Sequence, residues 1–193
     1  IMRRLLNYPG SKWRLSSKIV ELMPEHRTYL EPFFGSGAVL FAKEPSAIET
    51  VNDLDGNIVN LFSCIRENPD RLIRDIVLTP YSRQIYEEAM KKMYSFLDKD
   101  ENTSDPFERA KCFLVCCSMG YGFRTSNRKC GWKSDISGRE SAYALRNWVK
   151  LPEAVEQVAA RLKSVQIEHQ DAFELMKRYD NPKVLMYLDP PYC

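Results

Sequence analysis

A strand, a glycine turn, a helix, a second strand and an acid follow one another in the first third of this chain. Residues 27–30 are predicted to form a short strand that leads into the glycine turn at 35–37, and residues 37–43 are predicted to form the helix behind it. A second strand at 48–51 leads to Asp53, which lies 16 to 18 residues after the two glycines. This order is typical of one nucleotide-binding half of a doubly wound α/β fold.

The same alternation returns near the end of the sequence. Residues 165–168 and 184–188 predict two further strands, with a helix at 172–179 between them. Because the sequence stops just after the last strand, we expect an open, Rossmann-like sheet that is incomplete at its C-terminus. The segment 70–150 is mostly helical in pattern, so we expect it to be an insertion in an α/β domain made of 1–69 and 151–193.

Composition excludes few functions, but the distribution of charge is informative. A net charge of +2 points to no partner class. The cysteines form no C-x-x-C pair and histidine is scarce, so we expect no metal site. The sequence contains no signal peptide and no membrane-length apolar run, which favours a reduced cytoplasmic setting. Residues 120–139 contain five basic residues and one acidic residue, which gives this segment a local net charge of +4.

The glycine turn predicts a site for a cofactor that is not a pyrophosphate. Gly35 and Gly37 allow the backbone to pass close to a ligand, but G-x-G without a third glycine is not the dinucleotide motif. Glu31 would repel a pyrophosphate, which favours a cofactor with a positive or zwitterionic end and argues against an NAD-linked oxidoreductase. The alternative is a plain tight turn.

Two acids after predicted strands have two interpretations each. A carboxylate after the second strand can bind ribose hydroxyls or cap the next helix; Asp55 suits the cap, so we assign the ribose to Asp53. Asp171 can bind a purine amine while Phe173 packs on the ring, or it can cap the helix that follows. The residues alone leave this second choice open.

The last strand delivers an acid, two prolines and an aromatic ring to its carboxyl end. Pro190 and Pro191 cannot continue the strand and fix the direction of the backbone. Asp189 and a free carbonyl can then accept both hydrogens of a planar amine, while Tyr192 stacks on the ring that bears it. An ordinary β-turn is the alternative.

The basic segment between residues 120 and 133 suggests contact with nucleic acid. Arginine and lysine suit phosphates and guanine edges, asparagine suits adenine, and aromatic rings can stack or wedge between bases. The alternative is a solvated hairpin. The predicted DNA-binding residues are Arg124, Asn127, Arg128, Lys129, Trp132 and Lys133.

Five motifs together resemble the Dam-type DNA adenine methyltransferases, particularly the phage-like members. They occur in that family's order, with the target-recognition insertion before the fourth, and they span the chain. The motifs are Tyr8-Pro-Gly-Ser-Lys12, Glu31-Pro-Phe-Phe-Gly-Ser-Gly37, Asn52-Asp-Leu-Asp55, Asp171-Ala-Phe173 and Asp189-Pro-Pro-Tyr192.

The resemblance implies a Rossmann-like methyltransferase fold and transfer of a methyl group from S-adenosylmethionine (SAM) to the exocyclic amine of a flipped-out adenine in duplex DNA, without a metal. It assigns catalysis to Asp189, Pro190, Pro191 and Tyr192. It assigns SAM binding to Tyr8, Gly10, Lys12, Glu31, Pro32, Phe33, Gly35, Gly37, Asp53, Asp171, Phe173 and Asp189.

The alternatives are methylation of a cytosine amine and a non-catalytic fragment that binds SAM or DNA. The resemblance leaves open the recognised site and whether the protein works with a cognate restriction endonuclease, protects a phage genome or regulates expression. It also leaves open whether the protein is a monomer or a weak dimer.

Overall fold

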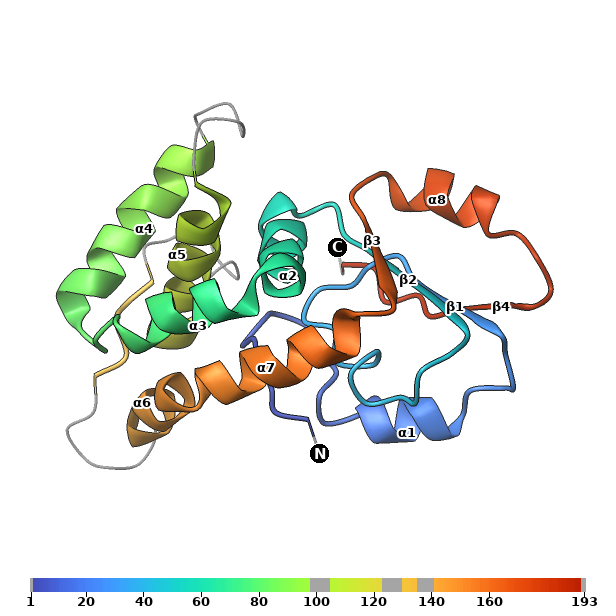
Figure 1. Ribbon diagram of the computed structural model, residues 1–193, viewed down its shortest axis with the longest axis horizontal. Coiled ribbons are helices and arrows are strands. Elements are labelled where there is room, and N and C mark those ends of the chain that lie inside the picture. The colour runs from blue at the N-terminus through green and yellow to red at the C-terminus, as the bar shows by residue number, and fades with distance from the viewer. Residues whose placement is uncertain (1, 98–104, 123–129, 135–140, 192–193) are drawn as a thin grey trace.

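The computed structural model describes residues 2–97, 105–122, 130–134 and 141–191 (Figure 1). Within them, one parallel sheet has the strand order β3-β2-β1-β4. Its strands are β1 (Thr28–Glu31), β2 (Ile48–Asn52), β3 (Val165–Glu168) and β4 (Val184–Met186). The architecture confirms the predicted α/β, Rossmann-like class.

The strand order creates a crevice between β1 and β4. The chain proceeds from β1 to β2 and β3 towards one edge and then returns to place β4 on the other side of β1. Ligands of open α/β sheets bind where the order reverses in this way, at the carboxyl ends of the strands. Leu30 lies opposite Met186, and the Tyr187 amide donates to the Leu30 carbonyl at 2.9 Å. The predicted terminal motif therefore leaves the sheet beside the end of β1.

Helices lie on both sides of the sheet and form a separate group beside it. Figure 1 shows α8 above the sheet and α1 below it, with α2 and α7 between the sheet and the remaining helices. Proline occupies the first turn of α3, α5 and α7, a position at which its missing N–H is not needed. The helices are α1 (Ser16–Glu21), α2 (Gly56–Glu67), α3 (Pro69–Val77), α4 (Arg83–Leu97), α5 (Pro106–Met119), α6 (Ser141–Val149), α7 (Leu151–Leu162) and α8 (Ala172–Arg178).

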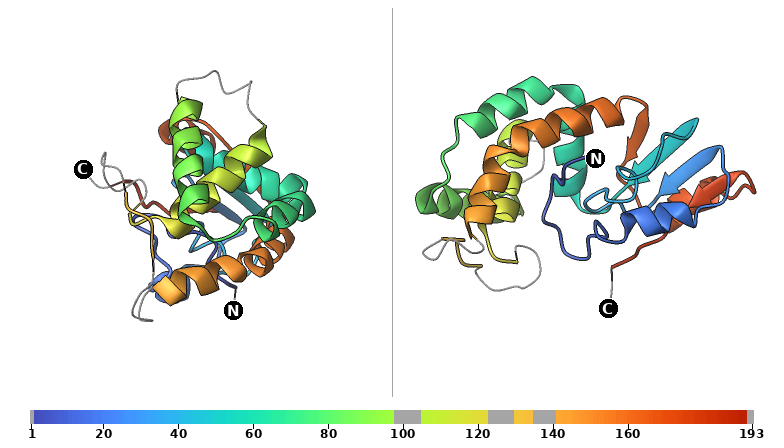
Figure 2. Two further views of the ribbon diagram at one scale, coloured as in Figure 1. Left: turned by 90° about the vertical axis from the view of Figure 1, so that its left-hand side faces the viewer. Right: turned by 90° about the horizontal axis from the view of Figure 1, so that it is seen from below.

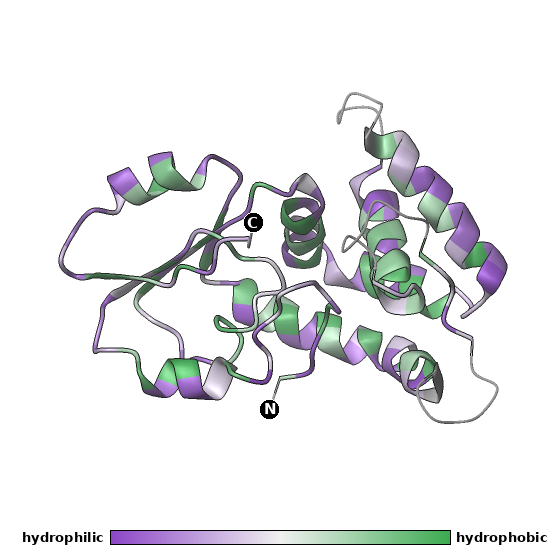
Figure 3. Cartoon of the chain, turned by 180° about the vertical axis from the view of Figure 1, so that it is seen from behind, coloured by the Kyte–Doolittle hydropathy of each residue, from purple (hydrophilic) through white to green (hydrophobic). Residues whose placement is uncertain are grey.

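One continuous hydrophobic core joins the sheet to the predicted insertion. Helix α5 is buried along most of its length and packs against α2, α3, α4 and α6. Phe62 of α2 and Phe113 of α5 are fully buried in this core, and the thiols of α5 fill it as small apolar groups. In Figure 3, α2 is mostly hydrophobic, whereas α4 alternates along its length. The boundaries of the insertion, 70–150, stay a prediction.

The helix predicted at 37–43 is wrong, because turns occupy this segment. The Phe41 and Lys43 amides donate to carbonyls four residues back, but Ala42 donates to Val39, three residues back, so the helical ladder is interrupted. Pro45 follows closely and disfavours helical geometry at the residue before it. So short a segment does not recover the cost of nucleating a helix. Hence no helix N-terminus stands behind the glycine turn.

Candidate active site

A cavity of about 610 Å³ opens at the carboxyl ends of β1, β2 and β4. It lies in the crevice that the strand order creates, and residues from the N-terminal turn close its other side. Pro32, Gly37, Asp171 and Phe173 do not line it, and Tyr192 lies outside the described residues. The predicted site residues that line the cavity are Tyr8, Gly10, Lys12, Glu31, Phe33, Gly35, Asp53, Asp189, Pro190 and Pro191.

The glycine turn is held against the end of β2. Gly35 has a φ of +50°, and its amide donates to Asp53 Oδ2 at 2.7 Å. Gly37 has a φ of +70°, and a Cβ there would lie 2.4 Å from the Phe41 ring and 2.6 Å from the Phe34 ring. Gly37 is therefore required by packing behind the cavity, whereas Gly35 brings the backbone to the cavity wall.

The two acids after β2 have separate positions. Asp55 caps α2 by accepting from the Asn57 amide at 3.0 Å, and the Tyr8 hydroxyl donates to it at 3.0 Å. Asp53 accepts from the Gly35 and Asp55 amides, one on each oxygen, at 2.7 and 2.8 Å. Burial raises the pKa of Asp53, although these hydrogen bonds oppose the rise. A carboxylate has further lone pairs, so Asp53 can still accept from a ligand in the cavity.

Glu31 places a buried carboxyl group in the cavity wall. It is 2 % exposed, and the Tyr29 hydroxyl donates to its Oε2 at 2.8 Å. Burial raises the pKa of Glu31 to about 8, and the charge of Asp189 adds to this effect. The hydrogen bond from Tyr29 and the positive charge of Lys43 act in the opposite direction.

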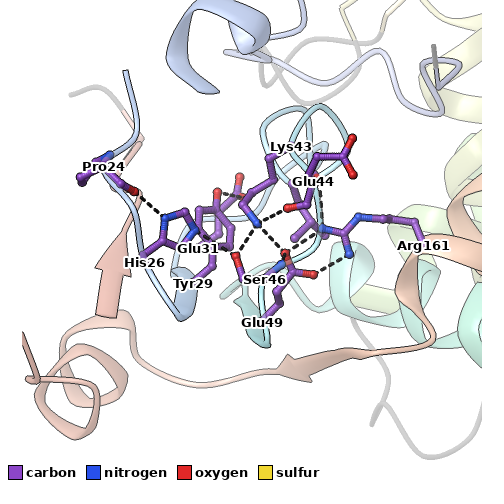
Figure 4. Close-up of polar contacts among 10 residues, drawn as sticks. Pro24, His26, Tyr29, Glu31, Lys43, Glu44, Ser46, Glu49 and Arg161 are labelled. Atoms are coloured by element: carbon purple, nitrogen blue, oxygen red, sulfur yellow. Dashed lines mark hydrogen bonds and ion pairs between the residues drawn. The ribbon is translucent and has the colours of Figure 1, made fainter. Parts of the chain in front are cut away.

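Behind Glu31 lies a buried ion network that the sequence patterns did not predict (Figure 4). Lys43 Nζ lies 4.7 Å from the centre of the Tyr29 ring and donates to Glu49 Oε1 at 2.6 Å. Arg161 donates to both oxygens of Glu49, at 2.5 and 2.8 Å. These two cations outweigh the effect of burial and lower the pKa of Glu49. The available signal for this network in the sequence was Glu49, an acid within a predicted strand.

Lys12 and Asp189, which also line the cavity, form an ion pair. Lys12 Nζ lies 2.8 and 2.7 Å from the two oxygens of Asp189 and also donates to the Gly10 carbonyl at 2.8 Å. The two side chains are 20 % and 22 % exposed. The pair ties the N-terminal turn to the segment after β4, and the sequence predicted both residues but not their contact.

Asp171 and Phe173 stand apart from the cavity. Asp171 caps α8 by accepting from the Phe173 and Glu174 amides, as one of its two interpretations predicted. Phe173 is 66 % exposed. Asn52 exchanges two hydrogen bonds of 3.0 Å with the backbone of Gln170, which fixes the loop after β3 beside β2. A role for Asp171 at a purine stays a prediction.

Two of the predicted DNA-binding residues are described. Trp132 packs against Tyr81 with ring centres 5.7 Å apart, and the Arg83 guanidinium lies 4.9 Å from the centre of its ring. Lys133 follows, with its amide bound to the Met119 carbonyl at 2.7 Å. The other predicted DNA-binding residues, Arg124, Asn127, Arg128 and Lys129, lie outside the described residues.

Comparison with known proteins identifies the family. The family model for D12 class N6 adenine-specific DNA methyltransferases matches residues 8–193. The chain belongs to this class. Membership confirms the predicted resemblance to Dam-type enzymes, and with it an adenine-specific DNA methyltransferase as the kind of enzyme; the class implies the use of SAM.

Relatives match over almost the whole chain. A type II methyltransferase of Methanocaldococcus jannaschii is 27% identical over 99% of this chain and 69% of its own length. The DNA adenine methylase of Escherichia coli K12 is 23% identical, and that of Haemophilus influenzae is 25% identical, each over 99% of this chain. The chain spans 65% and 64% of the length of these two methylases. No helix within the described ranges is long and apolar enough to cross a membrane.

Proposed function

We propose that this methyltransferase binds SAM in the cavity between β1 and β4 and methylates the N6 amine of an adenine flipped out of duplex DNA. The observation that carries the proposal is that Asp189 and Pro190 line the same cavity as Glu31 and Asp53. Acceptors for an amine thus share one cavity with acceptors for a cationic, ribose-bearing cofactor.

The donor set of the cavity fits SAM. Glu31 offers a carboxylate to the ammonium of the methionine part, and Asp53 offers one to the ribose hydroxyls. Two carboxylates would repel a pyrophosphate. At Gly35, an added Cβ would make only ordinary contact with the Tyr8 ring, at 3.5 Å, so it is the positive φ of +50° that favours glycine at this cavity wall. When bound, SAM supplies an electrophilic methyl group on a sulfonium sulfur.

Asp189 and Pro190 prepare the adenine amine as a nucleophile. The amine of a paired adenine is out of reach, so the base must leave the duplex. Its lone pair is delocalised into the ring, and hydrogen bonds from its two hydrogens to Asp189 and the Pro190 carbonyl favour a more tetrahedral nitrogen. The same bonds stabilise the positive charge that develops as the nitrogen is alkylated. Tyr192 is the predicted stacking partner of the base.

Lys12 acts on the reaction through Asp189. Its ammonium binds both carboxylate oxygens, which limits the rotation of Asp189. A fixed carboxylate accepts a hydrogen bond in one direction, so it aligns the amine without a further loss of side-chain freedom. Lys12 is therefore proposed as a positioning residue.

Transfer of labelled methyl from SAM to unmethylated duplex DNA, followed by nucleoside analysis, tests the proposal. We expect labelled N6-methyladenine with the wild type. Asp189→Ala should lose transfer by at least about a hundredfold while S-adenosylhomocysteine still binds, since it removes an acceptor that acts in the transition state. Asp180→Ala removes an exposed acid and serves as the control.

Other outcomes would redirect the assignment. Labelled N4-methylcytosine would favour the cytosine-amine alternative, and S-adenosylhomocysteine binding without transfer would favour a binding module. Wild-type turnover by Asp189→Ala would remove the role assigned to Asp189. Pairing with a restriction endonuclease stays a prediction; the relative from Methanocaldococcus jannaschii is named as a type II methyltransferase.

A further inference from the structure

A second, smaller cavity lies outside the proposed active site, where the N-terminal segment meets the helical part of the molecule. Its volume is about 150 Å³. Figures 1 and 2 show the N-terminal segment running between the sheet and these helices before it reaches α1. The lining is polar and basic, and it includes Arg3, Arg4, Asn7, Ser118, Asn147 and Lys150.

Two of the three cations at this cavity carry charge that no described residue neutralises. Arg3 pairs with Glu153, with Nε 2.8 Å from Oε2. Arg4 and Lys150 are exposed and form no ion pair with a described residue. Arg4 is held in place because its Nε donates to the Leu6 carbonyl at 2.8 Å. A fixed guanidinium beside a polar hollow suits an anion with several oxygens.

Further cations extend this surface in two directions. Arg14 and Lys133 both lie close enough to Arg4 to repel it. Two hydrogen bonds hold the backbone of Lys133. Its amide donates to the Met119 carbonyl, and its carbonyl accepts from the Tyr81 hydroxyl at 2.9 Å. Partial burial lowers the pKa values of Arg4 and Lys133; repulsion from Arg14 adds to the effect at Arg4, and repulsion from Arg4 adds to it at Lys133. The fold therefore brings these like charges together at a cost in stability.

The surface joins the two ends of the proposed reaction site. Arg14 lies two residues beyond Lys12, which binds Asp189. Lys133 is the last residue of the segment that the sequence predicts to contact DNA. Arg4 interacts electrostatically with both Arg14 and Lys133, so these cations form one basic surface that reaches from the N-terminal turn to the segment predicted to contact DNA. Phosphate contacts of this kind set the orientation of a protein on the duplex without selecting a sequence.

We propose that Arg4, Arg14, Lys133 and Lys150, here called the basic track, bind the DNA backbone phosphates beside the flipped adenine. The inference rests on the proposed function and extends it from the base to the backbone. At the smaller cavity, Arg4 and Lys150 would each neutralise one phosphate. The track would hold the duplex so that the strand carrying the target base passes over the cavity between β1 and β4.

The salt dependence of duplex binding tests the track. The logarithm of the binding constant falls with the logarithm of salt concentration with a slope of about −0.9 for each phosphate neutralised. We expect Arg4→Gln and Lys150→Gln each to reduce this slope by about 0.9, and the double variant by about 1.8. Arg4→Lys keeps the charge and should retain the wild-type slope.

Lys177→Gln is the control for net charge, because this exposed residue of α8 pairs only locally, with Glu174. Each variant should bind S-adenosylhomocysteine like the wild type, which shows that its fold and cofactor site survive.

Unchanged slopes in the double variant would overturn the basic track. An equal reduction by Lys177→Gln would also overturn it, because the effect would then be one of net charge. If the wild type binds DNA with the expected slopes but transfers no methyl group, the proposed function fails and the track stands. If it methylates DNA and the double variant keeps its slope, only the track fails.

Discussion

Glu31→Gln should stabilise the cofactor-free protein, and more so as the pH rises. The pKa of Glu31 is about 8 in the folded protein, against an ordinary value of 4.5. Folding thus favours the neutral acid. The associated stability is fully present below pH 4.5 and is lost as the pH rises through 8. The reason is that Glu31 ionises more readily in the unfolded chain than in the folded protein, so a rising pH favours unfolding.

The size of the effect follows from the two pKa values. Relative to a group that never ionises, the wild type loses about 1 kcal/mol at pH 5, about 3 kcal/mol at pH 7 and about 5 kcal/mol at pH 9. Glutamine is neutral at every pH and can still accept the hydrogen bond from Tyr29. The difference in free energy of unfolding between Glu31→Gln and the wild type should therefore grow by about 4 kcal/mol from pH 5 to pH 9.

Urea unfolding of the cofactor-free protein at these three pH values measures the difference. Groups that titrate in both proteins cancel in the comparison. Glu21→Gln, which changes an exposed acid of α1, should run parallel to the wild type. Parallel curves for Glu31→Gln as well would refute the argument, because they would mean that Glu31 titrates normally in the fold.

The same carboxyl group links cofactor binding to proton release. At pH 7 a group with a pKa of about 8 is roughly nine-tenths protonated, so pairing with an ammonium should release about 0.9 proton. Calorimetry of S-adenosylhomocysteine binding in buffers of different ionisation enthalpy counts this proton. Glu31→Gln should bind more weakly and release none, whereas release at the wild-type level would assign the proton to another group.

Two further predictions concern the walls of the cavity. Lys12→Gln should lower the single-turnover rate of methyl transfer roughly ten- to a hundredfold, the equivalent of one charged hydrogen bond of about 1.5–3 kcal/mol. Lys12→Arg should recover part of the lost rate. An unchanged rate for Lys12→Gln would exclude the positioning role. Gly37→Ala should lower the free energy of unfolding by about 2–5 kcal/mol through backbone strain and overpacking against two phenylalanine rings. Gly35→Ala, with an open Cβ position, should cost only the strain of its positive φ, so equal losses in urea unfolding would contradict the packing argument.

Local patterns in the sequence predicted much of the fold because their causes are local. The strand at 165–168 has the predicted bounds, and the acids Asp55 and Asp171 cap the helices that follow them. The doubly wound class followed from the spacing of the glycine turn and the acid after it. The prediction of a helix at 37–43 was wrong because Pro45, two residues beyond its end, disfavours helical geometry there.

Contacts between distant residues could not be predicted in the same way. The sequence analysis assigned no role to Glu49, because only the fold brings Arg161 of α7 and Lys43 to its carboxylate. Lys12 and Asp189 were each assigned to the cavity, but their pairing depends on β4 returning beside β1. No property of either local segment specifies that return.

The bond between Lys12 and Asp189 joins residues 177 positions apart. During synthesis, the N-terminal turn, β1 and β2 leave the ribosome long before β4 does, and β1 has no neighbour on one side until then. The proposed cofactor wall of the cavity can thus assemble before the proposed amine wall, which forms only once β4 and Asp189 have docked beside β1. Completion of the proposed site therefore depends on one pairing between segments that are synthesised far apart in time.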